Sequence, residues 1–108
     1  MANLPEMYQY RLPLNLRVSK VPLWLRIDCP RNFPISRPNL VVLARVVHKD
    51  VHPQTKVIST AMLEQWDLHR HGSNLLNVIR DIHARFDADA PIPEKMIKEG
   101  NVPASLQH

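Results

Sequence analysis

The chain has 108 residues, 44% of them hydrophobic and 22% charged, which is enough for one domain with one core and too little for two. It has no run of about 18 apolar residues, and its start, MANLPEMYQY, lacks the basic and apolar parts of a secretory signal. We therefore expect an intracellular protein without membrane insertion, and leave cytoplasmic, endosomal and mitochondrial locations open. The single cysteine, Cys29, excludes an internal disulfide and a thiolate zinc cluster.

The net charge of +4 comes from 14 Lys and Arg residues that are spread along the chain. A dispersed excess of this kind is typical of a solvated surface. The sequence also lacks the combination of aromatic and basic residues found in RNA-recognition strands. Nucleic-acid binding is therefore disfavoured, and a protein partner is expected instead.

Residues 10–18 alternate between apolar and other side chains, which predicts a strand with one buried face. The parity reverses after Ser19-Lys20, and the alternation then continues to Ile27, which predicts a hairpin. Because Ser-Lys suits a tight primed turn poorly, a slightly longer loop stays open. The apolar pairs expected across this hairpin are Val18 with Val21, Leu16 with Leu23, and Leu14 with Leu25.

Residues 29–38 contain three prolines, which exclude a helix and predict a stiff, extended connection. Residues 40–47 are apolar at both parities, as in a central strand that is covered on both faces. Such a sheet needs a covering layer. The segment after Gly72 can supply it as a helix capped by Ser73, whose apolar positions at helical spacing are Leu75, Leu76, Ile79, Ile82 and Phe86.

Near the C-terminus, residues 94–99 predict a short helix that ends at Gly100. The expected organisation is an N-terminal tail over residues 1–9, one domain over residues 10–100 and a C-terminal tail over residues 101–108.

Three motifs follow one another in the order of a known fold. Their sequences are Phe33-Pro34-Ile35-Ser36-Arg37-Pro38, His52-Pro53-Gln54, and the segment from Ile58 to Trp66 with its Leu-x-x-Trp ending. From residue 10 to residue 92 the chain resembles the ubiquitin-conjugating-enzyme fold. It is most similar to the non-catalytic variants (UEV domains), such as the one in the tumour-susceptibility subunit of the endosomal sorting complex.

This resemblance implies an α+β fold, in which an antiparallel meander sheet packs on a helix. The family opens with a helix of several turns, and residues 1–9 are too short for one. The N-terminal helix is therefore expected to be reduced or missing.

The resemblance places Ser59 at the position of the family's nucleophile. Ubiquitin transfer needs a thiolate, because a thioester is both activated and transferable to an amine. His52-Pro53-Gln54 is a degenerate form of the family's His-Pro-Asn motif, with Gln54 in place of the amide-donating asparagine. We therefore expect no enzymatic activity, no catalytic residue and no cofactor. Cys29 lies one strand too early and is interpreted as a buried small hydrophobe.

Trp66 occupies the family's core tryptophan position, where packing is expected. Trp24 lies on the polar-parity face of its strand, and with Arg26 it is the predicted contact for a partner. The resulting hypothesis is a non-catalytic protein-binding module, acting as a UEV-type recognition domain or as an accessory subunit, with ubiquitin as a candidate partner. The alternatives are an active conjugating enzyme and a small basic nucleic-acid-binding domain.

The sequence offers two further candidate sites, a histidine metal site and a groove for proline-rich peptides. His69, His71 and His83 could supply metal ligands, but no other ligand is evident, so no metal site is predicted. The sorting-complex UEV binds proline-rich peptides in a groove with two tyrosines, a methionine and a serine. The resemblance places these at Leu14, Ser19, near Arg45 and at Glu94. None matches, so this peptide function is not expected.

Overall fold

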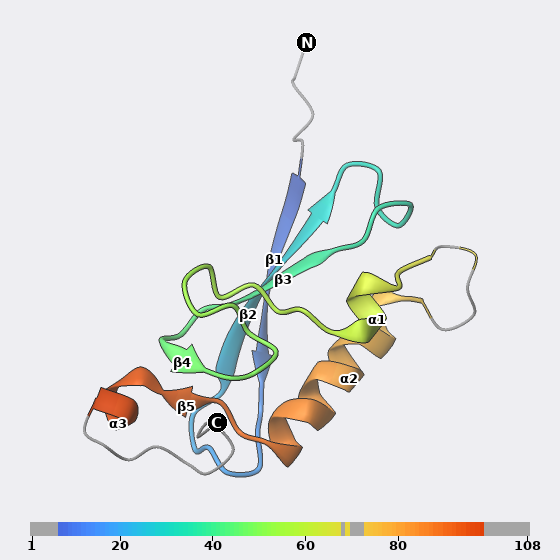
Figure 1. The fold of residues 1–108 in the computed structure, drawn as a ribbon. Helices are drawn as coiled ribbons and strands as arrows, with labels where there is room; N and C mark the ends of the chain where they lie inside the picture. The colour runs from blue at the N-terminus through green and yellow to red at the C-terminus, as the bar shows by residue number, and fades with distance from the viewer. Residues whose placement is uncertain (1–6, 68, 70–72, 99–108) are drawn as a thin grey trace.

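The computed structural model describes residues 7–67, 69 and 73–98. A three-stranded antiparallel sheet, ordered β1 (Met7–Leu14), β2 (Leu23–Pro30) and β3 (Asn39–Val42), packs on one long helix, α2 (Leu75–Ala88) (Figure 1). The α+β class and the antiparallel sheet that the sequence predicts are therefore confirmed. No helix among the described residues is long and apolar enough to cross a membrane.

The hairpin of β1 and β2 forms with a register two residues away from the predicted one. Leu14 lies opposite Leu23, and Leu12 lies opposite Leu25. Because side chains alternate with a period of two, a shift of two residues keeps the predicted face. The strands stop earlier than expected, and Val18 and Val21 are 72% and 70% exposed in a loop.

This loop, residues 15–22, is held by the C-terminal half of α2. The Arg17 N–H donates to Asp87 Oδ1 at 2.9 Å, and His83 Nε2 lies 2.9 Å from the Asn15 carbonyl oxygen. Leu16 is buried within the same loop. These contacts to the helix, which are distant in sequence, explain why the chain leaves the hairpin before the predicted turn.

The start of the sheet also differs from the prediction. β1 begins at Met7, three residues inside the segment expected to be a tail. Residues 1–6, which precede β1 and would contain any opening helix, lie outside the described part of the chain, so the expectation of a reduced or missing helix stays a prediction.

The predicted single strand over residues 40–47 is wrong in extent. Leu40, Val41 and Val42 are buried on both faces of β3, as expected. Beyond them the chain turns, with the Val46 N–H donating to the Ala44 carbonyl, and β4 (Val46–Val47) pairs instead with β5 (Ile92–Pro93). An apolar run indicates burial but does not show where a strand bends.

Three helices follow the sheet in the described residues: α1 (Ala61–Glu64), α2 and α3 (Glu94–Lys98). The cap of α2 is Asn74 and not Ser73, because the Asn74 side chain accepts the Asn77 N–H at 2.9 Å. The short helix predicted after residue 94 is confirmed as α3, and its predicted end at Gly100 lies outside the described residues.

The face of α2 that meets the sheet is set by Val78, Ile82 and Phe86, at intervals of four residues. Leu76, predicted to be on this face, is 55% exposed, and Val78 was missed. Together with Leu25, Leu40 and other buried apolar residues, this face forms one core.

Candidate functional site

The position that the resemblance assigns to a nucleophile holds an exposed serine with a fixed hydrogen bond. Ser59 immediately precedes Thr60, the N-cap of α1. The Ser59 hydroxyl donates to Glu64 Oε1 at 2.7 Å, and its N–H donates to the Asp50 carbonyl at 2.8 Å. The Glu64 carboxylate accepts the hydroxyl hydrogen bond, but a carboxylate is too weak a base to deprotonate an alcohol. The contact therefore orients Ser59 without activating it.

A small hollow of about 100 Å³ adjoins this serine. Its lining includes Ser59 itself, Ile58 and Leu63 on one side, and Arg37 and Pro38 on the other. The Arg37 guanidinium donates to the Leu63 carbonyl at 3.4 Å. The hollow is thus part of the packing between the proline-rich connection and α1, and its walls bring no acid–base pair to Ser59.

His52 serves the turn that carries it. Its Nδ1 accepts the backbone N–H groups of Gln54 and Thr55, each at 3.1 Å. The Lys56 N–H closes the turn on the His52 carbonyl at 3.0 Å. Both bonds occupy the lone pair of the nitrogen that would act as a base, so His52 has a structural role in this turn. In the described part of the chain no hydrogen bond joins His52 to Ser59.

Lys56, which belongs to none of the sequence motifs, connects three separate segments of the chain. Its backbone has φ 63°, a left-handed conformation unusual outside glycine. The Lys56 ammonium donates to the carbonyls of Val46 and Pro53, at 3.1 and 2.8 Å, and pairs with the Glu94 carboxylate. Through these three acceptors Lys56 connects the His52 turn to β4 and to α3. No local sequence pattern predicts these connections.

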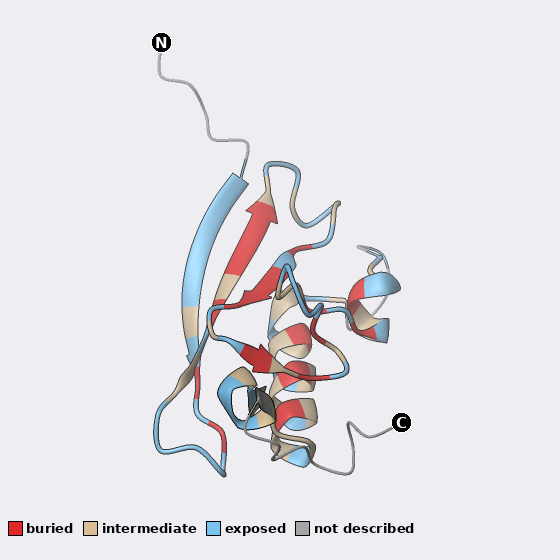
Figure 2. Ribbon diagram, turned by 60° about the vertical axis from the view of Figure 1, so that its left-hand side comes forward, coloured by how far each residue is buried: buried red, intermediate tan, exposed pale blue. Residues whose placement is uncertain are grey.

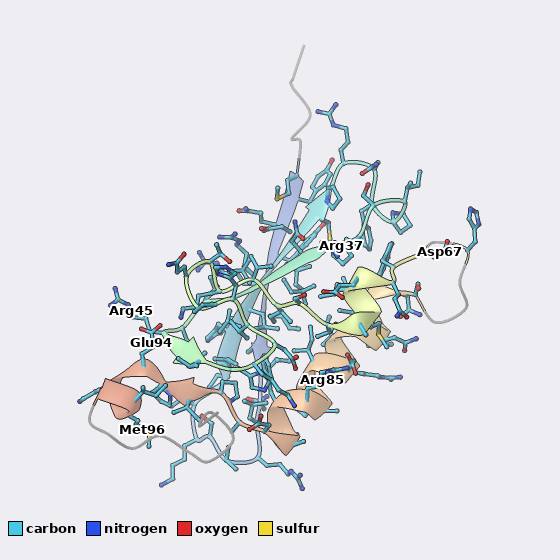
Figure 3. All side chains as sticks on the ribbon, in the orientation of Figure 1. Arg37, Arg45, Asp67, Arg85, Glu94 and Met96 are labelled. Carbon is cyan, nitrogen blue, oxygen red and sulfur yellow. The ribbon has the colours of Figure 1, made fainter. Side chains whose placement is uncertain are left out.

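One of the four positions that the resemblance assigns to the peptide groove, Glu94, takes part in this ion pair. Glu94, predicted at the serine position, is paired with Lys56, and its N–H donates to the Arg45 carbonyl at 3.0 Å, so both residues lie at one corner (Figure 3). Leu14 is buried, and the Ser19 hydroxyl donates to the Val21 carbonyl within its own loop. These positions supply no aromatic wall.

A buried histidine that directly follows β4 connects this strand to α2, and the sequence patterns did not predict its burial. His48 is 4% exposed, and its ring meets Phe86 edge-on at 4.8 Å. The Asp50 N–H donates to His48 Nδ1 at 3.0 Å, while Asp89 Oδ2 lies 4.0 Å from His48 Nε2. Burial lowers the pKa of His48, and the nearby carboxylates of Asp50 and Asp89 oppose that shift. Burial outweighs the carboxylates, so the pKa of His48 lies below its ordinary value and the neutral ring is favoured.

Arg85, a partly exposed residue of α2, contacts the same group of charged side chains. Its Nε donates to Asp81 Oδ2 at 2.9 Å, and its Nη1 lies 3.6 Å from Asp50 Oδ2. Because the Asp81 carboxylate accepts this hydrogen bond, it raises the pKa of Arg85 despite partial desolvation. These contacts connect α2 to the loop that follows β4.

Cys29 is the buried small residue expected from the sequence, whereas Trp66 is only partly buried and packs against the core. The Trp66 indole N–H donates to the Pro34 carbonyl at 2.8 Å, and its ring packs beside Phe33 at 5.9 Å. Cys29 is buried, and burial first, then the charge of Asp28, raises the pKa of its thiol. A buried thiol with a raised pKa is a poor nucleophile.

The predicted partner contacts, Trp24 and Arg26, lie on the outer face of the sheet, away from α2. Trp24 is 44% exposed and lines a hollow of about 360 Å³ with Arg11 and Leu43. The Arg26 guanidinium donates to both carboxylate oxygens of the buried Asp28, from Nε to Oδ1 at 2.9 Å and to Oδ2 at 3.2 Å, and from Nη2 to Oδ2 at 3.0 Å. Of the two, Trp24 is therefore the one that is available to a partner.

A second hollow, of about 320 Å³, lies on the opposite face of the same sheet. The alternation of residues 10–18 predicts a buried Tyr10 and therefore no hollow here, whereas Tyr10 is 56% exposed. Figure 1 shows the reason: this end of the sheet extends beyond α2. The residues that line the hollow are Tyr8, Tyr10, Cys29, Pro30, Arg31, Phe33 and Leu75.

Of the three histidines considered as metal ligands, His69 and His83 lie among the described residues. The His69 N–H donates to Asp67, and His83 contacts Asn15 and Asp87, whereas His71 lies outside the described residues. No group of three or more candidate ligands occurs in the part of the chain that the structure describes.

Comparison with known proteins adds no relative: no protein-family model matches the chain, and no curated protein matches it.

Proposed function

We propose that this chain is a non-catalytic module of the ubiquitin-conjugating-enzyme-like type, related to UEV domains, that works by binding other proteins. The observation that carries the proposal is the state of Ser59, whose hydroxyl is held by Glu64 at 2.7 Å in the nucleophile position of the resemblance. The chain's one thiol, Cys29, is buried one strand away from that position.

Two contacts support the fold assignment behind this proposal. The motif that contains Pro34 and the motif that ends at Trp66 are far apart in the chain, and the Trp66 indole joins them through the Pro34 carbonyl. Ser59 itself stands between the short pairing of Ile58 with Val51 and the cap of α1. Motifs of a common fold are expected to meet in this way.

The test is a thioester assay with ubiquitin-activating enzyme, ubiquitin and ATP, read on a non-reducing gel. We expect no thiol-sensitive ubiquitin adduct, because the Cys29 thiol is buried and an activated thiolate is required. Cys29→Ser is the matched control for any adduct that does form. An adduct that disappears in Cys29→Ser, or a thiol-resistant ester that disappears in Ser59→Ala, would overturn the proposal.

A further inference from the structure

The outer edge of β1 is open along five residues. Within the described chain β1 pairs with β2 alone, and residues 7–11 are exposed on both of their faces. Figure 2 shows this strand as a continuous exposed band at the margin of the sheet, beside the buried β2. An open edge is a template for an additional strand unless it is short, covered or blocked.

The register identifies which backbone groups face that edge. Pro13 lies opposite Trp24, and the Trp24 carbonyl accepts the Leu43 N–H from the β3 side at 2.9 Å. Trp24 thus directs its backbone away from β1, which makes the pair that it forms with Pro13 a non-hydrogen-bonded one. By alternation, Met7, Gln9 and Arg11 occupy the same kind of position, so their N–H and C=O groups point outward.

Hollows flank this edge on both faces of the sheet. Tyr8 and Tyr10 help to line the one on the α2 side, and Arg11 and Trp24 help to line the one on the outer side. A strand projects alternate side chains to opposite faces. A strand added to β1 would therefore place successive side chains over an aromatic groove and over the tryptophan hollow.

Charge indicates what kind of strand fits. Arg11 lies directly opposite Arg26, whose charge is already matched by Asp28. Arg11 itself forms no ion pair with another described residue, and the chain carries a net charge of +4. An acidic side chain on an incoming strand would meet this unmatched cation.

We propose that the β1 edge binds an extended, acidic segment of a protein partner, which joins the sheet as an additional strand. This inference rests on the proposed protein-binding function and gives that function a binding mode, strand addition, in which backbone bonds provide affinity and alternate pockets provide specificity. A second copy of the chain fits less well. β1 contains no acidic residue, so no register of β1 on β1 gives Arg11 a partner.

The first test uses a phage-displayed library of random dodecapeptides selected against the immobilised chain. We expect enriched peptides that alternate apolar residues with others and include Asp or Glu. A synthetic copy of the most enriched one should slow hydrogen exchange at the amides of Met7, Gln9 and Arg11. Proline-rich or neutral peptides, protection elsewhere, or no enrichment would overturn the proposal, as would dimerisation of the free chain through β1.

The second test blocks the edge without disturbing the hairpin. Gln9→Pro removes one outward N–H and no bond to β2, and Pro13 shows that the strand accepts proline at this parity. We expect Gln9→Pro to weaken binding of the selected peptide about tenfold or more, as for a lost backbone hydrogen bond. The matched control, Gln9→Ala, keeps the N–H and should change affinity less than about twofold. Equal effects of the two substitutions would refute strand addition.

Arg11→Glu tests the charge, with Arg11→Gln as the neutral control. Affinity for the acidic peptide should fall in the order wild type, Arg11→Gln, Arg11→Glu, and more steeply at low salt. Circular dichroism and thermal unfolding confirm that each variant is folded. If the peptide binds at Trp24 and its affinity is unchanged by Gln9→Pro, the strand-addition proposal fails and the proposed protein-binding function is retained. A ubiquitin thioester would instead refute the module and leave the edge unaffected.

Discussion

The two ends of β1 carry the same alternation and reach opposite outcomes. Leu12 and Leu14 pack into the core, whereas Tyr8 and Tyr10, on the same face of the same strand, remain largely exposed. The partners across the hairpin are apolar at both ends, from Leu23 to Cys29. Alternation of period two therefore specifies a face of a strand, and it does not determine whether another layer covers that face.

The covering layer explains the difference. Val78, Ile82 and Phe86 of α2 lie over the closed end, while Leu75, the first residue of the helix, already lines the hollow beside the tyrosines. The sheet extends past that point (Figure 1). The length of one helix thus divides the sheet into a packed end, which stabilises the fold, and an uncovered end, which is open to a partner.

The largest expected effect is the loss of the packed end's largest side chain. Phe86 is fully buried and contacts His48, so Phe86→Ala should lower the free energy of unfolding by about 3–5 kcal/mol, as for other buried aromatic residues. Urea denaturation measures this. Leu76→Ala, on the exposed face of the same helix, is the control and should cost less than about 0.5 kcal/mol apart from helix propensity. Equal costs would mean that the helix is rotated from its assigned face.

Local pattern predicted the parts of the fold that local chemistry determines. The hairpin face, the presence of a helix after Gly72 and the short α3 follow from periodicity and breakers. The register, the cap at Asn74 and the break between β3 and β4 did not follow. Each depends on contacts made across the chain, such as the hold of α2 on residues 15–22.

The candidate site divides in the same way. The sequence correctly anticipated that Trp24 would be exposed and that Cys29 would be buried. It gave no sign of Lys56, whose ammonium reaches acceptors 3, 10 and 38 residues away, or of the burial of His48. Neither residue lies in a motif, and the significance of each arises only when segments that are distant in the chain come together.

A smaller effect, in the packed end, should appear as a pH dependence of stability. In the folded state burial lowers the pKa of His48, while Asp50, Asp89, Lys49 and Arg85 are the charged groups around it. As pH falls below about 6.5, the unfolded chain takes up a proton that the folded chain resists. Stability should therefore decrease from about pH 7 toward the lowered pKa. Urea midpoints across this range measure it.

His48→Gln provides the control, since it removes the titrating ring and keeps a polar side chain. The difference in pH dependence between wild type and His48→Gln isolates His48 from the other histidines, including His83 and His52. If the two proteins lose stability in parallel as the pH falls, then the pKa of His48 is the same in the folded and unfolded chains. His48 would then take up a proton in the folded protein, and the inference of a lowered pKa would be wrong.

The smallest expected effect lies at the open end, and it tests the comparison within one strand. Tyr10→Ala should change the free energy of unfolding by less than about 1 kcal/mol, because the ring stands in a hollow and gives up little buried area. Leu12→Ala, two residues along on the same face, removes a side chain packed against the core and should cost about 2 kcal/mol or more. Thermal and urea unfolding of the two variants give the ratio directly. A Tyr10→Ala cost equal to that of Leu12→Ala would mean that the tyrosine end is also packed, which would leave no aromatic groove for an added strand. A small cost, with weaker binding of the acidic peptide, would show that this aromatic surface contributes to recognition and not to folding.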